Sequence, residues 1–239
     1  MIATVESVRG LNGDVFRMEL AGSFPEMKPG QFAEIQVPGQ YLRRPISLCD
    51  FAKDHISLVI RAVGEGTRAL RDMRPGETLD LLCPLGNGFD TEKSGDTPLL
   101  VGGGVGLPPL YALCRLLIEK GAKPTVAAGF AGARDVFLLD EFRALGAKVL
   151  VASIDGTLGV KGLVTDVMPD SGYSYVYSCG PKAMMRAVCE KAGSLGEYSL
   201  EERMGCGFGA CMGCAVKTAG GMRRVCKDGP VFAGKEILW

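Results

Sequence analysis

The chain has 239 residues, which is enough for one large or two modest domains with a hydrophobic core. Lysine and arginine total 27 and aspartate and glutamate also total 27, so no net positive charge favours a nucleic acid or an anionic membrane as a partner. Apolar residues make up 47% of the chain, as in an ordinary globular protein, and the 34 glycines indicate many tight turns or close approaches to ligands.

Residues 1–94 show the short alternating apolar patterns of β-strands. The alternation is clearest over residues 31–37 and 56–63. Turn sequences such as Lys28-Pro29-Gly30 and Arg74-Pro75-Gly76 separate these runs. Short strands with frequent turns are typical of a small antiparallel barrel, which is the fold we expect for this first domain.

From residue 95 to residue 197 the pattern changes to strands that alternate with helices. The predicted strands span residues 99–101, 126–130, 149–153 and 173–178. The predicted helices are one that carries Leu110 to Leu117 and ends at Gly121, then residues 136–145 and 183–192. Alternating strands and helices predict a parallel sheet with helices on both faces, so the second domain is expected to be of the α/β class.

The final segment, residues 198–239, fits neither pattern, and we expect a ligand rather than a core to organise it. Four of its cysteines have the spacing C-x4-C-x2-C-x11-C, and they are Cys206, Cys211, Cys214 and Cys226. The first three reproduce the opening spacing of plant-type [2Fe–2S] ligation. The glycines between them let the backbone fold closely around a cluster and offer N–H groups to its sulfurs.

Two other interpretations of these cysteines stay open. Four thiolates also suit tetrahedral zinc, although zinc ribbons usually show two C-x2-C pairs and this chain has one. Free thiols are the other alternative. A Rieske centre needs two histidine ligands, whereas the only histidine, His55, lies in a predicted strand far from the cysteines.

The chain shows no membrane or export signal. Its most apolar stretch, residues 99–118, contains several glycines and the pair Pro108-Pro109, which predict a strand, a turn and a helix rather than a membrane span. Glu6 and Arg9 lie near the N-terminus with no apolar run after them, which is unlike a secretory signal. Nine cysteines, an odd number, favour thiol or metal chemistry over disulfides, and together these features predict a cytoplasmic location.

A glycine-rich turn follows the first predicted strand of the α/β domain. Its glycines are Gly102, Gly103, Gly104 and Gly106. Backbone N–H groups and the helix dipole at such a turn suit a phosphate group. The match to G-x-G-x-x-G fails at its last position, where Leu107 stands, so a purely structural turn stays open as an alternative.

Four motifs occur in the order found in ferredoxin-reductase-like flavoproteins. They are Arg43-Arg44-Pro45-Ile46-Ser47-Leu48, Gly64-Glu65-Gly66-Thr67, the glycine turn and Cys179-Gly180-Pro181. With Glu201-Glu202-Arg203-Met204 before the cysteines and Cys226-Lys227-Asp228-Gly229-Pro230 after them, essentially the whole chain resembles the electron-transfer subunits of class B dihydroorotate dehydrogenases. The resemblance implies a flavin-binding β-barrel domain at 1–94, an α/β NAD-binding domain at 95–197 and a [2Fe–2S] segment at 198–239.

The resemblance also implies a set of FAD-binding residues. Arg44 would pair with the FAD pyrophosphate, because a bidentate guanidinium matches phosphate geometry, and Ser47 would hydrogen-bond near the reactive edge of the flavin. Pro45 and Ile46 of the same motif also belong to the set, Arg61, Ala62 and Val63 would line the flavin, and Gly66 and Thr67 would hold the phosphates. Ile46 stands where the wider family has an aromatic residue, so flavin stacking would have to come from elsewhere or be weaker.

For the nicotinamide cofactor, the resemblance implies the glycine turn together with Cys179, Gly180 and Pro181. Cys179 would approach the nicotinamide ring, and a buried thiol at a strand end is the structural alternative. A preference for NADH over NADPH rests on the resemblance alone, since no ribose-binding acid can be assigned. Trp239, the only tryptophan, is interpreted as a C-terminal hydrophobic anchor, with contact to a flavin or partner as the alternative.

The implied function is electron transfer. The resemblance implies electrons passing from NADH to FAD, to the cluster and then to FMN in a separate catalytic subunit that oxidises dihydroorotate in pyrimidine synthesis, in a complex with two copies of each subunit. FAD is the necessary intermediate, because a nicotinamide gives up two electrons as hydride and a [2Fe–2S] cluster carries one at a time.

Two other functions are retained as alternatives. The small subunit of an NADH-dependent ferredoxin NADP oxidoreductase or of a sulfide dehydrogenase has similar motifs, and it would assemble with a larger subunit that holds further iron–sulfur clusters. A zinc-stabilised, nucleotide-binding sensor module belongs to another class. It would be colourless and would not turn over NADH.

Overall fold

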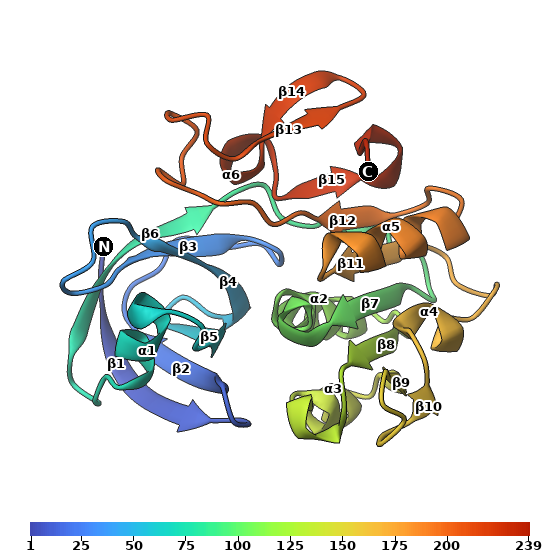
Figure 1. Cartoon of the computed structure of the whole chain (residues 1–239), viewed down its shortest axis with the longest axis horizontal. Coiled ribbons are helices and arrows are strands. Elements are labelled where there is room, and N and C mark those ends of the chain that lie inside the picture. The colour runs from blue at the N-terminus through green and yellow to red at the C-terminus, as the bar shows by residue number, and fades with distance from the viewer.

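A closed six-stranded antiparallel barrel forms the N-terminal part of the computed structural model, which describes residues 1–239 (Figure 1). Its strand order is β1-β2-β5-β4-β3-β6. The strands are β1 (Ile2–Gly10), β2 (Val15–Ala21), β3 (Phe32–Gln36), β4 (Arg44–Phe51), β5 (His55–Arg61) and β6 (Thr78–Leu85), with helix α1 (Glu65–Arg71) between β5 and β6. The predicted antiparallel barrel is therefore confirmed.

Strand β3 is buried on both faces, and this property positions the sites described below. Ala33 and Ile35 belong to the core cluster inside the barrel. Because successive side chains of a strand point to opposite faces, Phe32 and Glu34 lie on the outer face, and both are buried there as well. Something outside the barrel therefore covers the outer face of β3.

A seven-stranded sheet follows, in the order β10-β9-β8-β7-β11-β12-β15. Its strands are β7 (Leu99–Gly103), β8 (Thr125–Phe130), β9 (Lys148–Ser153), β10 (Val160–Lys161), β11 (Val176–Cys179), β12 (Glu197–Ser199) and β15 (Val231–Ala233). All neighbours pair in parallel except β15, which is antiparallel to β12. The helices are α2 (Pro108–Glu119), α3 (Leu139–Ala144), α4 (Val164–Val167) and α5 (Lys182–Lys191), and short 3-10 turns occupy Thr91–Lys93, Gly104–Gly106, Ala133–Asp135 and Gly234–Glu236.

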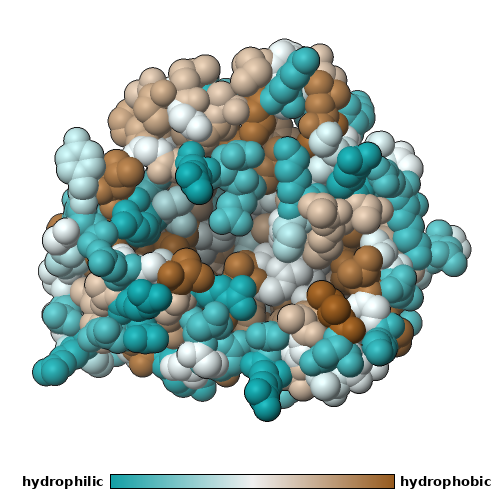
Figure 2. All heavy atoms as spheres, in the orientation of Figure 1, coloured by the Kyte–Doolittle hydropathy of each residue, from teal (hydrophilic) through white to brown (hydrophobic).

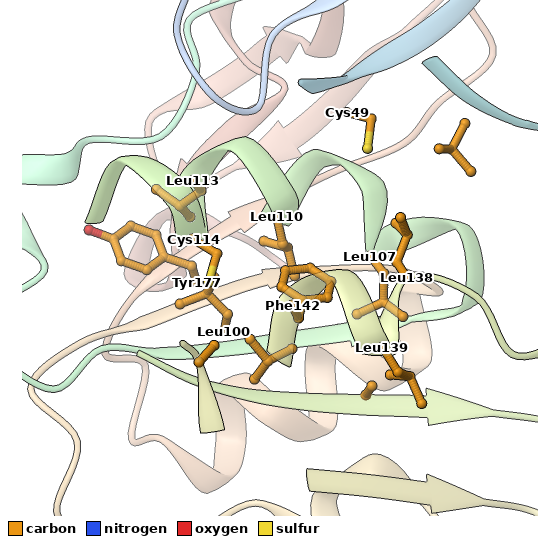
Figure 3. Packing of buried hydrophobic residues seen from close by; sticks show 14 of the residues in the cluster. Cys49, Leu100, Leu107, Leu110, Leu113, Cys114, Leu138, Leu139, Phe142 and Tyr177 are labelled. Atoms are coloured by element: carbon orange, nitrogen blue, oxygen red, sulfur yellow. The ribbon is translucent and has the colours of Figure 1, made fainter. Parts of the chain in front are cut away.

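Helices cover both faces of this sheet, as predicted. Leu100 of β7 packs in one core cluster with Leu110 of α2 and Phe142 of α3, and Figure 3 shows these side chains converging. Its neighbour Leu99 packs in a different cluster with Val188 of α5. Adjacent residues of one strand are therefore buried under helices on opposite faces of the sheet. Because both faces are covered, the strands carry apolar residues at successive positions rather than only at every second one.

Two predicted elements differ from the structure. The helix expected over residues 136–145 is shorter, because Val136 is extended and Leu138 adopts the left-handed conformation with φ 64°. The strand expected over residues 173–178 begins only at Val176. None of the helices combines the length and the apolar character that crossing a bilayer requires.

The C-terminal segment has a core, contrary to the expectation that a ligand alone would organise it. It folds into the hairpin of β13 (Ala215–Thr218) and β14 (Gly221–Arg224), helix α6 (Val225–Asp228) and β15. Phe232 of β15 packs in one buried cluster with Phe32 of the barrel and with Cys214 and Cys226. This segment therefore supplies the cover over the outer face of β3, and the three-part domain division stays a prediction.

Candidate cofactor sites

The glycine turn and the Cys179 motif meet at one point of the sheet. β7 lies between β8 and β11, with Gly102 of β7 opposite Cys179 of β11. The chain winds away from β7 in both directions, so the ends of β7 and β11 form a switch point, where open α/β sheets bind ligands. A Cβ atom on Gly106 would lie 2.2 Å from the carbonyl oxygen of Cys179 and 2.6 Å from Cα of Gly180. The backbone of the turn at Gly106 therefore crosses directly over the backbone of Cys179 and Gly180, at the predicted nicotinamide site.

Met184 and the Cys179 thiol lie next to this crossing. Gly103 packs against Met184, whose sulfur would lie 2.6 Å from an added Cβ atom. Burial raises the pKa of the Cys179 thiol to about 12, so it stays neutral at physiological pH. A hollow lies beside the crossing, lined by Gly180, Pro181, Lys182, Met185, Leu200, Glu201 and Glu202. The crossing itself offers a nicotinamide ring a neutral thiol and a methionine side chain, whereas Lys182, Glu201 and Glu202 bring charges to the adjoining hollow. Binding of NAD(H) at this point remains a prediction.

The two motifs predicted to hold FAD phosphates also meet. The Arg44 side chain lies against Gly66 of α1, where an added Cβ atom would be 2.7 Å from Arg44 Nε. Nη2 of Arg44 donates to Gln40 Oε1 at 2.8 Å and Nη1 donates to the carbonyl oxygen of Leu42. Arg44 forms no ion pair with a carboxylate, whereas Arg43 beside it is paired with Asp80. Its charge is therefore available to a pyrophosphate, which fits the chemistry of FAD.

Thr67 shapes the turn before α1. Its hydroxyl oxygen accepts the backbone N–H groups of Val63 at 3.0 Å and Gly64 at 3.1 Å, and the hydroxyl donates to the carbonyl oxygen of Gly64 at 3.1 Å. This side chain is already engaged, so a contact with phosphate would have to displace one of these bonds. The turn leaves Val63 67% exposed, an apolar side chain that a flavin ring could cover.

Two residues of the flavin motif on strand β4, Pro45 and Ser47, lie on the same face as Phe32 and Glu34. Glu34 pairs with Pro45 and Phe32 pairs with Ser47, and residues opposite each other in adjacent strands share a face. Ile46 packs instead against the barrel core. Its side chain therefore points away from Pro45 and Ser47, so flavin stacking would not involve it. At the end of β5, Arg61 Nε donates to Asp14 Oδ2 at 2.8 Å, and Ala62 follows with its N–H bonded to the carbonyl oxygen of Asp14.

We expect Arg44→Ala to weaken FAD binding by about tenfold to a hundredfold, the range that corresponds to losing ~1.5–3 kcal/mol of charge-assisted hydrogen bonds. The measurement is the dissociation constant of FAD by fluorescence titration of the flavin-free chain. Arg71→Ala is the matched control, because Arg71 is exposed on α1 and pairs only with the adjacent Asp72. Equal FAD affinity in both variants would rule out Arg44 as the pyrophosphate ligand.

The four cysteines of the C-terminal segment lie in two pairs. The thiols of Cys206 and Cys211 are within hydrogen-bond reach of one another, and those of Cys214 and Cys226 form a second such pair. No three cysteine, histidine, aspartate or glutamate side chains converge on one point. A tetrahedral zinc ion needs four ligands around one centre, whereas a [2Fe–2S] cluster takes two thiolates on each of two irons. The arrangement therefore fits the two-iron cluster better than zinc.

Backbone N–H groups point at the thiols, as an iron–sulfur cluster requires. Ala210 and Cys211 donate to Cys206 Sγ at 3.3 and 3.5 Å, Gly213 donates to Cys211 Sγ at 3.4 Å, and Cys226 donates to Cys214 Sγ at 3.4 Å. Although burial raises the pKa of Cys206, these donors outweigh it and lower the pKa to about 6. Cys206 is therefore a thiolate at pH 7, which is the form that binds iron.

Three residues that the sequence did not identify contact the cluster loop or support it: Arg224, Asp228 and Glu34. Arg224 Nη1 donates to the carbonyl oxygen of Gly209 at 3.0 Å, and Asp228 Oδ2 accepts Arg224 Nε at 3.1 Å. Glu34 lies directly under Gly207 of the same loop. The sequence carried no signal for these contacts, since each joins residues far apart in the chain or resembles an ordinary surface charge. Trp239 packs edge-on against Tyr198, with ring centroids 5.6 Å apart, as expected of a C-terminal anchor.

The chain is similar to known proteins in sequence and in fold. The sequence profile of the iron-sulfur cluster binding domain of dihydroorotate dehydrogenase B matches residues 201–238. The chain is 43% identical to the dihydroorotate dehydrogenase B (NAD(+)) electron transfer subunit of Bacillus velezensis over 98% of this chain and 97% of that protein. Among solved structures, an NADH-dependent reduced ferredoxin-NADP oxidoreductase superposes with a TM-score of 0.89 at 30% identity, covering 100% of this chain and 90% of the other.

A more distant structure shares the fold alone. Phthalate dioxygenase reductase, described as a modular structure for electron transfer from pyridine nucleotides to [2Fe–2S], superposes with a TM-score of 0.70 at 21% identity over 81% of this chain and 64% of the other. The barrel and the α/β sheet are thus of the ferredoxin-reductase type. With full-length similarity to curated relatives and a matching cluster domain, the chain belongs to the family of dihydroorotate dehydrogenase B electron transfer subunits.

Proposed function

We propose that this chain carries electrons between a dihydroorotate-oxidising FMN subunit and NAD(H), through FAD and a [2Fe–2S] cluster. The observation that carries the proposal is the shared outer face of β3 and β4. Pro45 and Ser47 of the flavin motif lie on this face, and Phe32 on the same face packs with Cys214 and Cys226. Both predicted redox sites therefore lie against one pair of strands, which suits transfer between them.

The direction of transfer follows from electron balance. Oxidation of dihydroorotate to orotate releases two electrons and two protons. The electrons would pass from the partner subunit through the cluster and FAD sites and, with one proton, reduce NAD+ to NADH, while the other proton would go to solvent. This direction is opposite to the one expected from the resemblance, in which NADH was the donor. FAD would supply the chemistry that joins one-electron and two-electron steps. The chain itself would position the groups, with Arg44 at the pyrophosphate and with Gly106 letting the turn after β7 approach the end of β11 closely at the nicotinamide site.

An apolar surface beside the cluster loop supports docking of a partner there. Phe208, between Cys206 and Cys211, is 57% exposed, Met212 is 50% exposed and Met222 of the hairpin is 59% exposed. Figure 2 shows brown and tan atoms gathered over the part of the molecule where Figure 1 places β13, β14 and α6. Aromatic and methionine side chains are enriched in protein interfaces. The proposal includes a complex with two copies of each subunit, located in the cytoplasm, where thiols stay reduced.

The test is reconstitution with the FMN-containing catalytic subunit. We expect a complex on size exclusion and NAD+ reduction on adding dihydroorotate, with both lost in Phe208→Glu, because this change puts a charge into the apolar surface. Leu163→Glu is the control, since Leu163 is 60% exposed but precedes α4 on the α/β domain, distant from the cluster segment in sequence. No complex and no dihydroorotate-dependent NAD+ reduction would contradict the proposal. Reduction of a ferredoxin with a larger iron–sulfur partner would instead favour the ferredoxin-NADP oxidoreductase alternative.

A further inference from the structure

Glu34 is a buried acid without a hydrogen-bond partner. Its side chain is fully buried on the outer face of β3, with an exposed fraction of 0%. Neither Oε1 nor Oε2 has a hydrogen-bond partner. Enclosing a carboxyl group in this way is costly unless the group is paired, so the fold retains an energetically unfavourable feature at this position. Such a feature suggests a role other than stability.

The cluster loop covers Glu34 directly. Gly207, the residue after the cluster ligand Cys206, has φ +74°, a conformation that favours glycine. A Cβ atom there would lie 2.4 Å from Cγ and 2.7 Å from Oε1 of Glu34. The loop thus needs glycine at this position both for its backbone conformation and for its close contact with the acid.

The charges that act on Glu34 come from the arginine pair Arg43-Arg44 and from the cluster loop. Arg43 and Arg44 act on the carboxyl from the flavin strand, and Cys206 acts on it from the cluster loop. Neither guanidinium hydrogen-bonds the carboxyl group. Arg43 donates to Asp80 and to the backbone oxygen of Glu34, and Arg44 is held by the loop that precedes β4. The negative charge of Glu34 is therefore not cancelled by a direct ion pair.

We propose that Glu34 sets the reduction potential of the [2Fe–2S] cluster, through a negative charge enclosed beneath Gly207 beside the Cys206–Cys211 pair. The inference rests on the proposed function in requiring the bound cluster. Adding an electron near an ionised carboxyl group is unfavourable, and the effect is large where water is excluded. Glu34 thereby lowers the potential of the cluster and favours release of its electron towards FAD. It acts through the cluster environment and is a positioning charge, not a catalytic residue.

The test is a potentiometric titration of the cluster, followed by electron paramagnetic resonance, in the wild-type chain and in Glu34→Gln. Burial raises the pKa of Glu34 to about 7, so the titration is run at pH 9, where the carboxyl is ionised. We expect the variant cluster to have the more positive potential by about 59 mV, which is a tenfold change in a one-electron equilibrium. Glu19→Gln is the control, because Glu19 lies on β2, where it pairs with His55. The cluster of this variant should have the reduction potential of the wild-type cluster.

An unchanged cluster potential in Glu34→Gln would overturn the inference. Glu34→Met provides a second neutral variant of similar length, in case the amide disturbs the loop. Loss of the cluster from both variants at wild-type thermal stability would also contradict the inference, since it would show that the carboxyl is needed for assembly. A wild-type chain that takes up no cluster would instead contradict the proposed function, so the two failures are distinguishable.

Discussion

Cys211→Ser should remove the [2Fe–2S] cluster and leave FAD bound. A serine hydroxyl does not replace a soft thiolate ligand, and Cys211 is exposed, so the substitution leaves the core packing intact. We expect dihydroorotate-dependent NAD+ reduction by the complex to fall by more than about a hundredfold. Mutating a residue that only hydrogen-bonds to a metal ligand typically costs about 10–100-fold, and loss of a ligand itself should cost more. The measurements are iron content, the visible spectrum and turnover of the reconstituted complex.

Cys83→Ala provides the comparison for this prediction. Cys83 is a buried cysteine of the barrel core, outside the ligand set. We expect this variant to lose some stability, as a small core truncation does, but to keep its iron and its electron transfer. If Cys211→Ser retained the cluster signal of the wild-type chain, the assignment of the four ligands would be wrong.

Gly106→Ala should disrupt the nicotinamide site. The added methyl group would collide with the carbonyl of Cys179 and with Cα of Gly180, and neither is a flexible side chain that could move aside. The turn that holds Gly106 would have to move away from the end of β11, at a cost of ~1–3 kcal/mol in stability. We expect the KM for NADH to rise by about tenfold or more, because small displacements of a binding backbone weaken positioning strongly. Anaerobic stopped-flow reduction of FAD by NADH measures this effect.

Gly13→Ala is the matched control for that variant. Gly13 lies in the open loop between β1 and β2, where an added Cβ atom meets nothing within 4 Å. Its KM for NADH and its melting temperature should be those of the wild-type chain. A Gly106→Ala variant with an unchanged KM would show that the nicotinamide binds elsewhere.

The alternation of apolar residues was sufficient to predict the barrel and the α/β sheet, because both patterns extend over many residues. The three-residue strands β12 and β15 could not be predicted in this way, since a period needs a longer run to be visible. The left-handed Leu138, which delays the start of α3, is set by tertiary packing, and leucine gives no local signal for that conformation.

For the candidate sites, spacing identified the four cysteines, and the resemblance supplied the flavin and nicotinamide motifs. Their three-dimensional relations were not visible in the sequence. Glu34 reads as the polar member of an alternating strand, and only the fold shows that Gly207 covers it. Contacts between segments far apart in the chain decide such a role, so local pattern alone could not assign it. The phosphate role expected of Thr67 stays a prediction, and its hydroxyl also closes the turn before α1.

The most direct test of electron transfer through FAD and a [2Fe–2S] cluster is an anaerobic visible absorption spectrum of the purified chain, recorded before and after addition of NADH. We expect flavin bands on top of a broad cluster absorbance, with both bleached by NADH, because the FAD and the cluster exchange electrons with the nicotinamide. A colourless protein that contains zinc, and that stays colourless after reconstitution with iron, sulfide and FAD, would contradict this function.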